Sequence, residues 1–193
     1  MRKQILICMC VVCLILTATN CGSYYTINTE TTPTQSLSAY KTIHVGWLDM
    51  NEDNFKTYDY ETKEAWAKVI EAMNIQQLPG FLKEFLPGKI VTTAKSKSEG
   101  VADGVELYIK FSNAQYNSQT SSTAQVFFGR LAGSDTLDCT IHFIDVKTNT
   151  EIYKVDINFD SKAGSAYSSM GFEGRVTNTV YNMAYFLSEK LTE

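Results

Sequence analysis

Few side chains in this sequence are of the types that catalyse reactions or bind metals. His44 and His142 are the only histidines. Each lies on the face of its expected strand opposite the main apolar residues, so the two would approach one another if their strands were neighbours. Two histidines and a carboxylate can bind zinc, but such a site needs at least three converging ligands. We interpret both as ordinary sheet-surface histidines.

A second group of candidate ligands is acidic. Asp49, Asn51 and Asp53 have the spacing of the first ligands of a calcium-binding loop. The sixth position of that loop is Asn54 instead of glycine, and the twelfth is Tyr60 instead of glutamate. Because the bidentate carboxylate is missing, we interpret the segment as a solvated loop.

Catalytic and nucleotide-binding motifs are also missing. Ser169 has a glycine two residues after it but none two residues before it, so it fails the nucleophile-elbow pattern. No glycine-rich loop has the spacing that holds a dinucleotide or a nucleoside triphosphate. The sequence therefore predicts no catalytic residue, no metal and no cofactor, and we expect that the protein is not an enzyme.

The amino terminus has the pattern of a secretory signal peptide. Arg2 and Lys3 precede an apolar run over residues 5–16, and small and polar residues then lead to Cys21. The run is too short to span a bilayer, which takes about 20 apolar residues. We predict that residues 1–20 are a leader that is removed.

With a cysteine at its exit, this leader resembles the lipobox of bacterial lipoproteins. The resemblance implies cleavage before Cys21 and attachment of a diacylglycerol to its sulfur, so that the membrane is a partner through a lipid anchor. Asn20 departs from the Gly, Ala or Ser usual at its position. The absence of an acidic residue at Gly22 and Ser23 implies, by the same analogy, the outer membrane of a bacterial envelope. We expect the domain to face the periplasm, and the sequence leaves a surface-exposed orientation open.

Composition narrows the choice of partners. Loss of the leader removes two of the 17 basic residues and leaves 15 against 21 acidic ones, a net charge of −6. No basic patch remains to neutralise a run of phosphates, so we expect no nucleic-acid partner. Beyond Cys21 the only cysteine is Cys139, among alternating apolar residues, where we expect it to be buried and inert.

The chain divides into three parts. Residues 1–20 are the signal peptide, residues 21–38 are mostly polar and read as a lipidated flexible tether, and residues 39–193 suit a single globular domain. Alternation of apolar residues predicts strands, and an i, i+3, i+4 spacing predicts helices. The expected elements are strands at 40–48, 89–94, 105–111, 137–146 and 152–160, and helices at 66–73, 79–85 and 172–191.

This order, β-α-α-β-β-β-β-α, predicts a two-layer α/β (α+β) fold. A helix between the first two strands allows a parallel crossover, whereas the turn at residues 147–150 favours an antiparallel hairpin with Asn149 in a left-handed conformation. We therefore expect a mixed sheet of about five strands, with helices packed on one face and the other face partly open.

Four segments together resemble a known family. They are the strand at 40–45, Ala102-Asp103-Gly104 before a strand, the stretch 129–133 before another, and the hairpin at 145–151. Their layout resembles the lipoproteins called domain of unknown function 4410, within the fold group of curli-secretion lipoproteins and lipoprotein activators of penicillin-binding proteins. The resemblance implies no catalytic residue.

Exposed aromatic residues beside arginine are typical of protein interfaces. Phe127 and Phe128 with Arg130 form one such segment, and Tyr58 with Tyr60 forms a second aromatic group, on the loop before the first expected helix. We treat these five as possible partner contacts. The alternative is that they pack inward, at a strand start and against the first helix.

These observations favour a membrane-anchored envelope lipoprotein that acts as a non-enzymatic protein-binding or assembly module with an envelope protein as partner. The alternative is a lipoprotein that binds a glycan or another small molecule through tyrosine-rich surfaces. A hydrolase without a recognisable motif ranks third. The sequence leaves the oligomeric state open.

Overall fold

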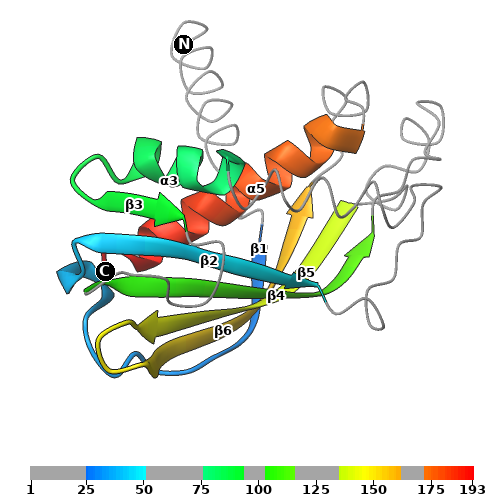
Figure 1. The fold of residues 1–193 in the computed structure, drawn as a ribbon. Coiled ribbons are helices and arrows are strands. Elements are labelled where there is room, and N and C mark those ends of the chain that lie inside the picture. Colours follow the sequence, from blue (N-terminus) through cyan, green and yellow to red (C-terminus); the bar gives the residue numbers. More distant parts are fainter. Residues whose placement is uncertain (1–24, 51–75, 94–102, 116–134, 162–171) are drawn as a thin grey trace, which may run out of the picture.

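The computed structural model describes residues 25–50, 76–93, 103–115, 135–161 and 172–193 (Figure 1). In these residues the chain forms six strands and two α-helices with one short 3-10 helix. The elements are β1 (Tyr25–Glu30), η1 (Leu37–Ala39), β2 (Thr42–Met50), α3 (Leu78–Phe85), β3 (Ile90–Thr93), β4 (Val105–Gln115), β5 (Asp135–Asp145), β6 (Thr150–Ser161) and α5 (Phe172–Lys190).

The six strands form one mixed sheet in the order β1-β6-β5-β4-β2-β3. Strands β4, β2 and β3 are parallel to one another, whereas β1, β6, β5 and β4 pair in antiparallel fashion. The predicted α+β class and the mixed sheet are confirmed. The sheet has one strand more than the five expected, and the helix expected at 66–73 lies outside the described residues.

Apolar and polar side chains alternate along the central strands, so the two faces of the sheet differ in polarity. On β4, Leu107 and Ile109 are fully buried, whereas Tyr108 is half-buried and Lys110 is exposed. Successive side chains of a strand point to opposite faces, and β5 continues the pattern because Ile141 pairs with Ile109. One face of the sheet therefore carries the core and the other carries polar side chains.

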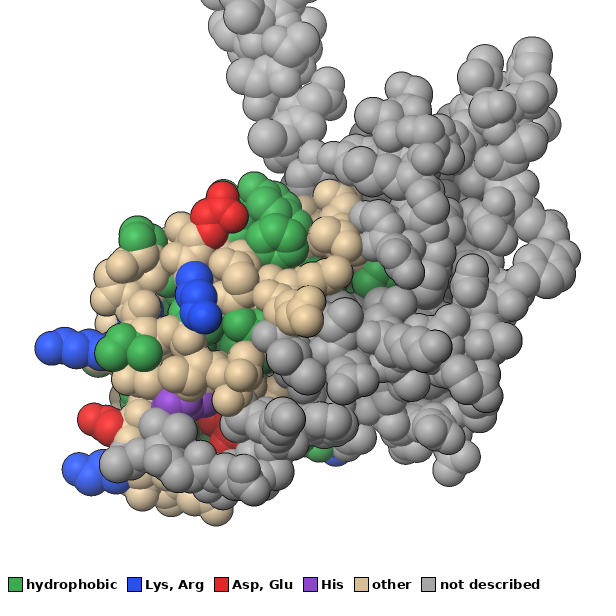
Figure 2. All heavy atoms as spheres, turned by 45° about the horizontal axis from the view of Figure 1, so that its top comes forward, with side chains coloured by type: hydrophobic (Ala, Val, Ile, Leu, Met, Phe, Trp, Pro, Cys, Tyr) green, Lys and Arg blue, Asp and Glu red, His purple; other side chains and the backbone are tan. Residues whose placement is uncertain are grey.

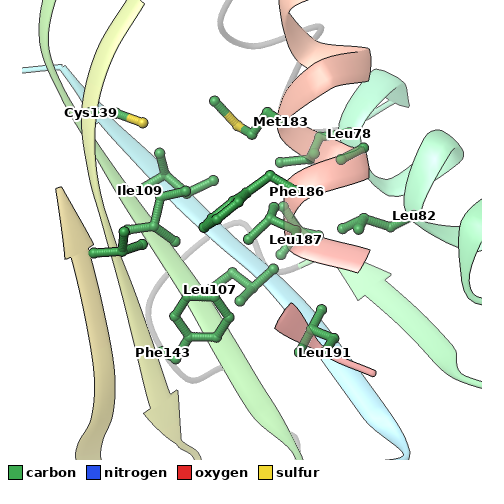
Figure 3. Close-up of a cluster of buried hydrophobic side chains, with 14 of the residues drawn as sticks. Leu78, Leu82, Leu107, Ile109, Cys139, Phe143, Met183, Phe186, Leu187 and Leu191 are labelled. Atoms are coloured by element: carbon green, nitrogen blue, oxygen red, sulfur yellow. The ribbon is translucent and has the colours of Figure 1, made fainter. Parts of the chain in front are cut away.

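Both described α-helices cover the core face (Figure 1). Figure 3 shows Met183, Phe186 and Leu187 of α5 directed at Leu107 and Ile109 of β4. All five are fully buried. The prediction that helices pack on one face of the sheet is confirmed for α3 and α5. Burial of side chains of this size is the main stabilising contribution. No described helix is both long and apolar enough to pass through a bilayer.

The N-terminal segment departs from the prediction. The expected tether over residues 21–38 is wrong from Tyr25 onward, because β1 pairs with β6 and extends the sheet. Tyr25 packs against Phe186 with ring centroids 4.9 Å apart, and its hydroxyl donates a hydrogen bond to Oε2 of Glu189 at 2.9 Å. Threonine favours strands as well as polar linkers, so composition alone pointed to the wrong state.

The hairpin between β5 and β6 confirms the turn prediction. Asn149 has a φ of 51°, in the left-handed region. One oxygen of Asp145 accepts a hydrogen bond from the backbone N–H of Thr148 at 2.8 Å, and the other accepts one from the Tyr40 hydroxyl at 2.5 Å. These bonds, that from Tyr40 foremost, lower the pKa of Asp145 to about 2. Asp145 therefore links the hairpin to the segment before β2 through hydrogen bonds, and its role there is structural.

Candidate interaction surfaces

The side chains singled out as partner contacts lie outside the described residues. This holds for Phe127, Phe128, Arg130, Tyr58 and Tyr60. It holds for Cys21 as well, so lipid attachment at Cys21 and partner binding at the five aromatic and basic side chains stay predictions.

The two histidines do not form one site. Strand β4 lies between β2, which carries His44, and β5, which carries His142. His44 is only 3% exposed, so its interpretation as a surface histidine is wrong. Its Nδ1 lies 2.5 Å from Oγ1 of Thr92, and its Nε2 lies 3.1 Å from the carbonyl oxygen of Asp103. Both ring nitrogens of His44 therefore have protein partners.

Gly104 leaves the space that His44 occupies. A Cβ at this position would lie 2.7 Å from Nε2 of His44 and 2.7 Å from the carbonyl oxygen of Thr42. The φ of Gly104 is 135°, a backbone angle that residues other than glycine rarely adopt. The Asp103-Gly104 pair before β4 is thus explained by close packing at the strand start.

The described residues offer little for metal or thiol chemistry. Among them, no three or more His, Cys, Asp or Glu side chains are placed to hold one metal ion. Cys139 is buried as predicted, and burial raises the pKa of its thiol. A thiol that stays protonated is a poor nucleophile and a poor ligand.

The sheet face opposite the helices carries rows of polar side chains on β4, β5 and β6. Cross-strand pairing places them in three rows, each running across the strands. We call this surface the polar face. Its members are Tyr108, His142 and Lys154 in the first row, Lys110, Thr140 and Asp156 in the second, and Asn113, Asp138 and Asn158 in the third.

Hydrogen bonds between neighbouring strands hold the carboxylates of the polar face in place. Asp138 accepts bonds from the side-chain amides of Asn113, at 3.0 Å, and of Asn158. Asp156 accepts bonds from the hydroxyls of Thr140, at 2.6 Å, and of Thr29 on β1, at 2.5 Å.

The two bonds to Asp156 also favour its ionised form. The hydrogen bonds from Thr140 and Thr29 are the main causes that lower the pKa of Asp156. A carboxylate held ionised by donors is poorly suited to take up a proton as a general base. It is well suited to present fixed hydrogen-bond acceptors, with Lys110 and Lys154 as neighbouring donors.

A second surface lies on the outer side of the helices. Phe81 and Phe85 of α3 meet Tyr181 of α5 edge to face, with ring centroids 5.3 Å and 5.1 Å apart. Tyr185 joins them at 6.1 Å from Phe85. We call these four residues the aromatic surface.

The aromatic surface is open to solvent although it is largely apolar. Tyr181 is 41% exposed and Tyr185 is 49% exposed, and the two phenylalanines are half-buried. Figure 2, which turns the helix side toward the viewer, shows hydrophobic side chains at the molecular surface. Sequence reasoning missed this surface. The signal was the i, i+4 pair of tyrosines on α5, which falls outside the apolar stripe of that helix.

Comparison with solved structures finds several proteins that align with most of this chain. The PelC dodecamer from Paraburkholderia phytofirmans is 14% identical, with a TM-score of 0.47 over 83% of this chain and 95% of that one. Protein XCC0632 from Xanthomonas campestris is 9% identical, with a TM-score of 0.40 over 86% and 93%. Lipoprotein GNA1162 from Neisseria meningitidis is 14% identical, with a TM-score of 0.32 over 75% and 96%.

No family model matches the chain, and no curated protein matches it. Membership of the domain of unknown function 4410 family therefore stays a prediction. This chain is similar to these solved structures at low sequence identity. The names of those proteins assign no role to this chain.

Proposed function

We propose that this chain is a lipoprotein of a bacterial envelope, anchored through acylated Cys21 and facing the periplasm from the outer membrane. One observation carries the proposal. A positive, then apolar leader ends at a cysteine, and an ordered strand begins four residues later at Tyr25. The anchor and the domain thus follow one another with almost no linker. Two or three acyl chains make a durable anchor, because each buried CH₂ contributes about 0.8 kcal/mol.

The domain acts in this proposal as a non-enzymatic module that binds an envelope protein at the polar face. Small molecules prefer concave, mostly apolar pockets. The polar face is instead one side of a sheet, with both signs of charge and an aromatic ring at Tyr108. Fixed carboxylates beside Lys110 and Lys154 favour a partner with complementary charges, which steer association and set specificity.

Photo-crosslinking in intact cells tests this function. A photoreactive amino acid replaces Lys110 in one strain and Lys154 in another, and Lys147 in the exposed β5–β6 turn is the matched control. We expect both face positions to crosslink to the same envelope protein and the control to give no such adduct. The yield of the adduct at position 110 should also fall when Lys154→Glu reverses a charge of the polar face.

Three results would contradict binding of a protein at this face. They are no adduct from either position, different proteins at the two positions, or the same adduct from Lys147. Adducts that contain sugar instead of peptide would favour the alternative, a glycan-binding lipoprotein.

A further inference from the structure

The short distance between the predicted anchor and the fold restricts how the domain can lie at a membrane. Four residue steps separate Cys21 from Tyr25, and a fully extended chain of that length spans at most about 14 Å. Tyr25 is the first residue of β1 and is fixed by its pairing with Phe159 on β6. If Cys21 is acylated, as the proposed function holds, the start of β1 must therefore stay close to the lipid headgroups.

The start of β1 lies beside the turn of α5 that carries Tyr185, one residue of the aromatic surface. The Tyr25 hydroxyl is bonded to Glu189, and its ring contacts Phe186. Phe186 follows Tyr185 directly, and Glu189 lies one helical turn beyond Tyr185 on the same side of α5. Burial and the bond to Glu189 raise the pKa of Tyr25 to about 12, and Tyr185 is near enough to add to the shift. The start of β1 and Tyr185 of the aromatic surface thus lie on the same side of α5.

We propose that the aromatic surface rests on the membrane that holds the acyl chains of Cys21, with its rings at the level of the headgroups. Tyrosine combines an apolar ring with a polar tip and is enriched at membrane interfaces for that reason. The headgroup layer on each side of a bilayer is about 5–7 Å deep, which suits side chains that project from a helix. The occupant of this surface is therefore lipid.

The charges near the aromatic surface agree with insertion by rings rather than attraction to phosphate. Lys83 and Glu84 are exposed on α3, and Glu189 and Lys190 lie on α5. The two signs balance among these four described residues, so they form no basic cluster that would draw the surface to anionic lipid. Because the polar face lies across the sheet from the helices, this orientation directs it away from the bilayer, where a periplasmic partner can reach it.

Lipid-restricted quenching tests the orientation. Acylated protein purified from membranes carries a fluorescent label on Ser188→Cys or Glu84→Cys at the aromatic surface, or on Lys110→Cys at the polar face as the matched control. Cys139 is buried and does not compete for the label. The protein is reconstituted into vesicles of phosphatidylethanolamine and phosphatidylglycerol that contain a lipid with a nitroxide near the top of its acyl chain.

We expect the labels at Ser188 and Glu84 to be quenched several-fold more than the label at Lys110. The double variant Tyr181→Ser, Tyr185→Ser should reduce quenching at Glu84, whereas Tyr108→Ser on the polar face should leave it unchanged. Equal, weak quenching at all three positions would overturn the inference, and so would a double variant without effect.

Mass spectrometry of Cys21 in the same preparation separates this inference from the proposed function. An acylated, vesicle-bound protein with unquenched labels refutes only the orientation. A protein with an unmodified Cys21 that does not bind vesicles refutes the anchor on which the orientation depends.

Discussion

The two sides of the sheet differ in what holds them together. On the helix side, large apolar side chains from α3, α5 and the strands are buried in one core cluster, and the aromatic surface lies on the outer side of the two helices. On the polar face, the contacts are hydrogen bonds between side chains of adjacent strands, such as that from Asn113 to Asp138. Stability therefore resides mainly under the helices, and the polar face can change with little cost to the fold.

The first way to break this contrast is to remove the packing beneath the aromatic surface. Phe186 is fully buried and contacts both Tyr25 and Phe159. We expect Phe186→Ala to lower the free energy of unfolding by about 3–5 kcal/mol, through lost burial and a residual cavity. Urea unfolding measures the loss. A decrease below about 1 kcal/mol would contradict the view that α5 and β1 are held together by this side chain.

The second variant disturbs a close backbone approach at the start of β4, outside the nine side chains of the polar face. Gly104→Ala places a methyl group against His44 and the Thr42 backbone in a conformation unfavourable for alanine. We expect a loss of about 1–3 kcal/mol. Gly88→Ala is the matched control, because nothing lies within 4 Å of its added Cβ. Thermal unfolding should separate the two variants, and equal stability would show that the close approach at Gly104 is not needed.

A third prediction concerns the acid sensitivity of the hairpin. The pKa of Asp145 is lowered in the folded state from 3.8 to about 2. The ionised carboxylate thus stabilises the fold above pH 4, and this contribution is lost as the pH falls from about 4 to 2. Asp145→Asn should lower the stability by about 1 kcal/mol at neutral pH and flatten the pH dependence in that range. Unfolding curves at several pH values measure both effects, and an unchanged profile would contradict the role of Tyr40 and Thr148.

The smallest expected change in stability comes from a variant that compares two neighbouring residues of α5. Tyr185 is next to Phe186 but half exposed. We expect Tyr185→Ser to change the free energy of unfolding by about 0.5 kcal/mol or less, measured beside Phe186→Ala under the same conditions. A loss as large as that of Phe186→Ala would mean that the aromatic surface is part of the core.

The central strands could be predicted from the sequence because their apolar residues alternate without interruption. Leu107, Ile109 and Ile141 follow this rule, and the structure buries each of them. The turn at Asn149 was predictable for a similarly local reason, since few residues other than glycine tolerate a positive φ.

The remaining features depend on partners distant in sequence. Strand β1 is an edge strand of six residues, and its contacts come from β6 and α5, more than 120 residues away. His44 is buried because Gly104 and Thr92 surround it, which no local pattern reveals. The aromatic surface likewise requires two helices to meet, so its tyrosines looked like ordinary polar positions of a single helix.

The most direct test of the whole account is the chemical structure of the mature amino terminus. Mass spectrometry of the protein purified from membranes should find Cys21 as the first residue, with a diacylglycerol on its sulfur, followed directly by Gly22. An unmodified amino terminus at any other residue, on a protein recovered without membranes, would contradict the anchor, the short linker and the orientation together.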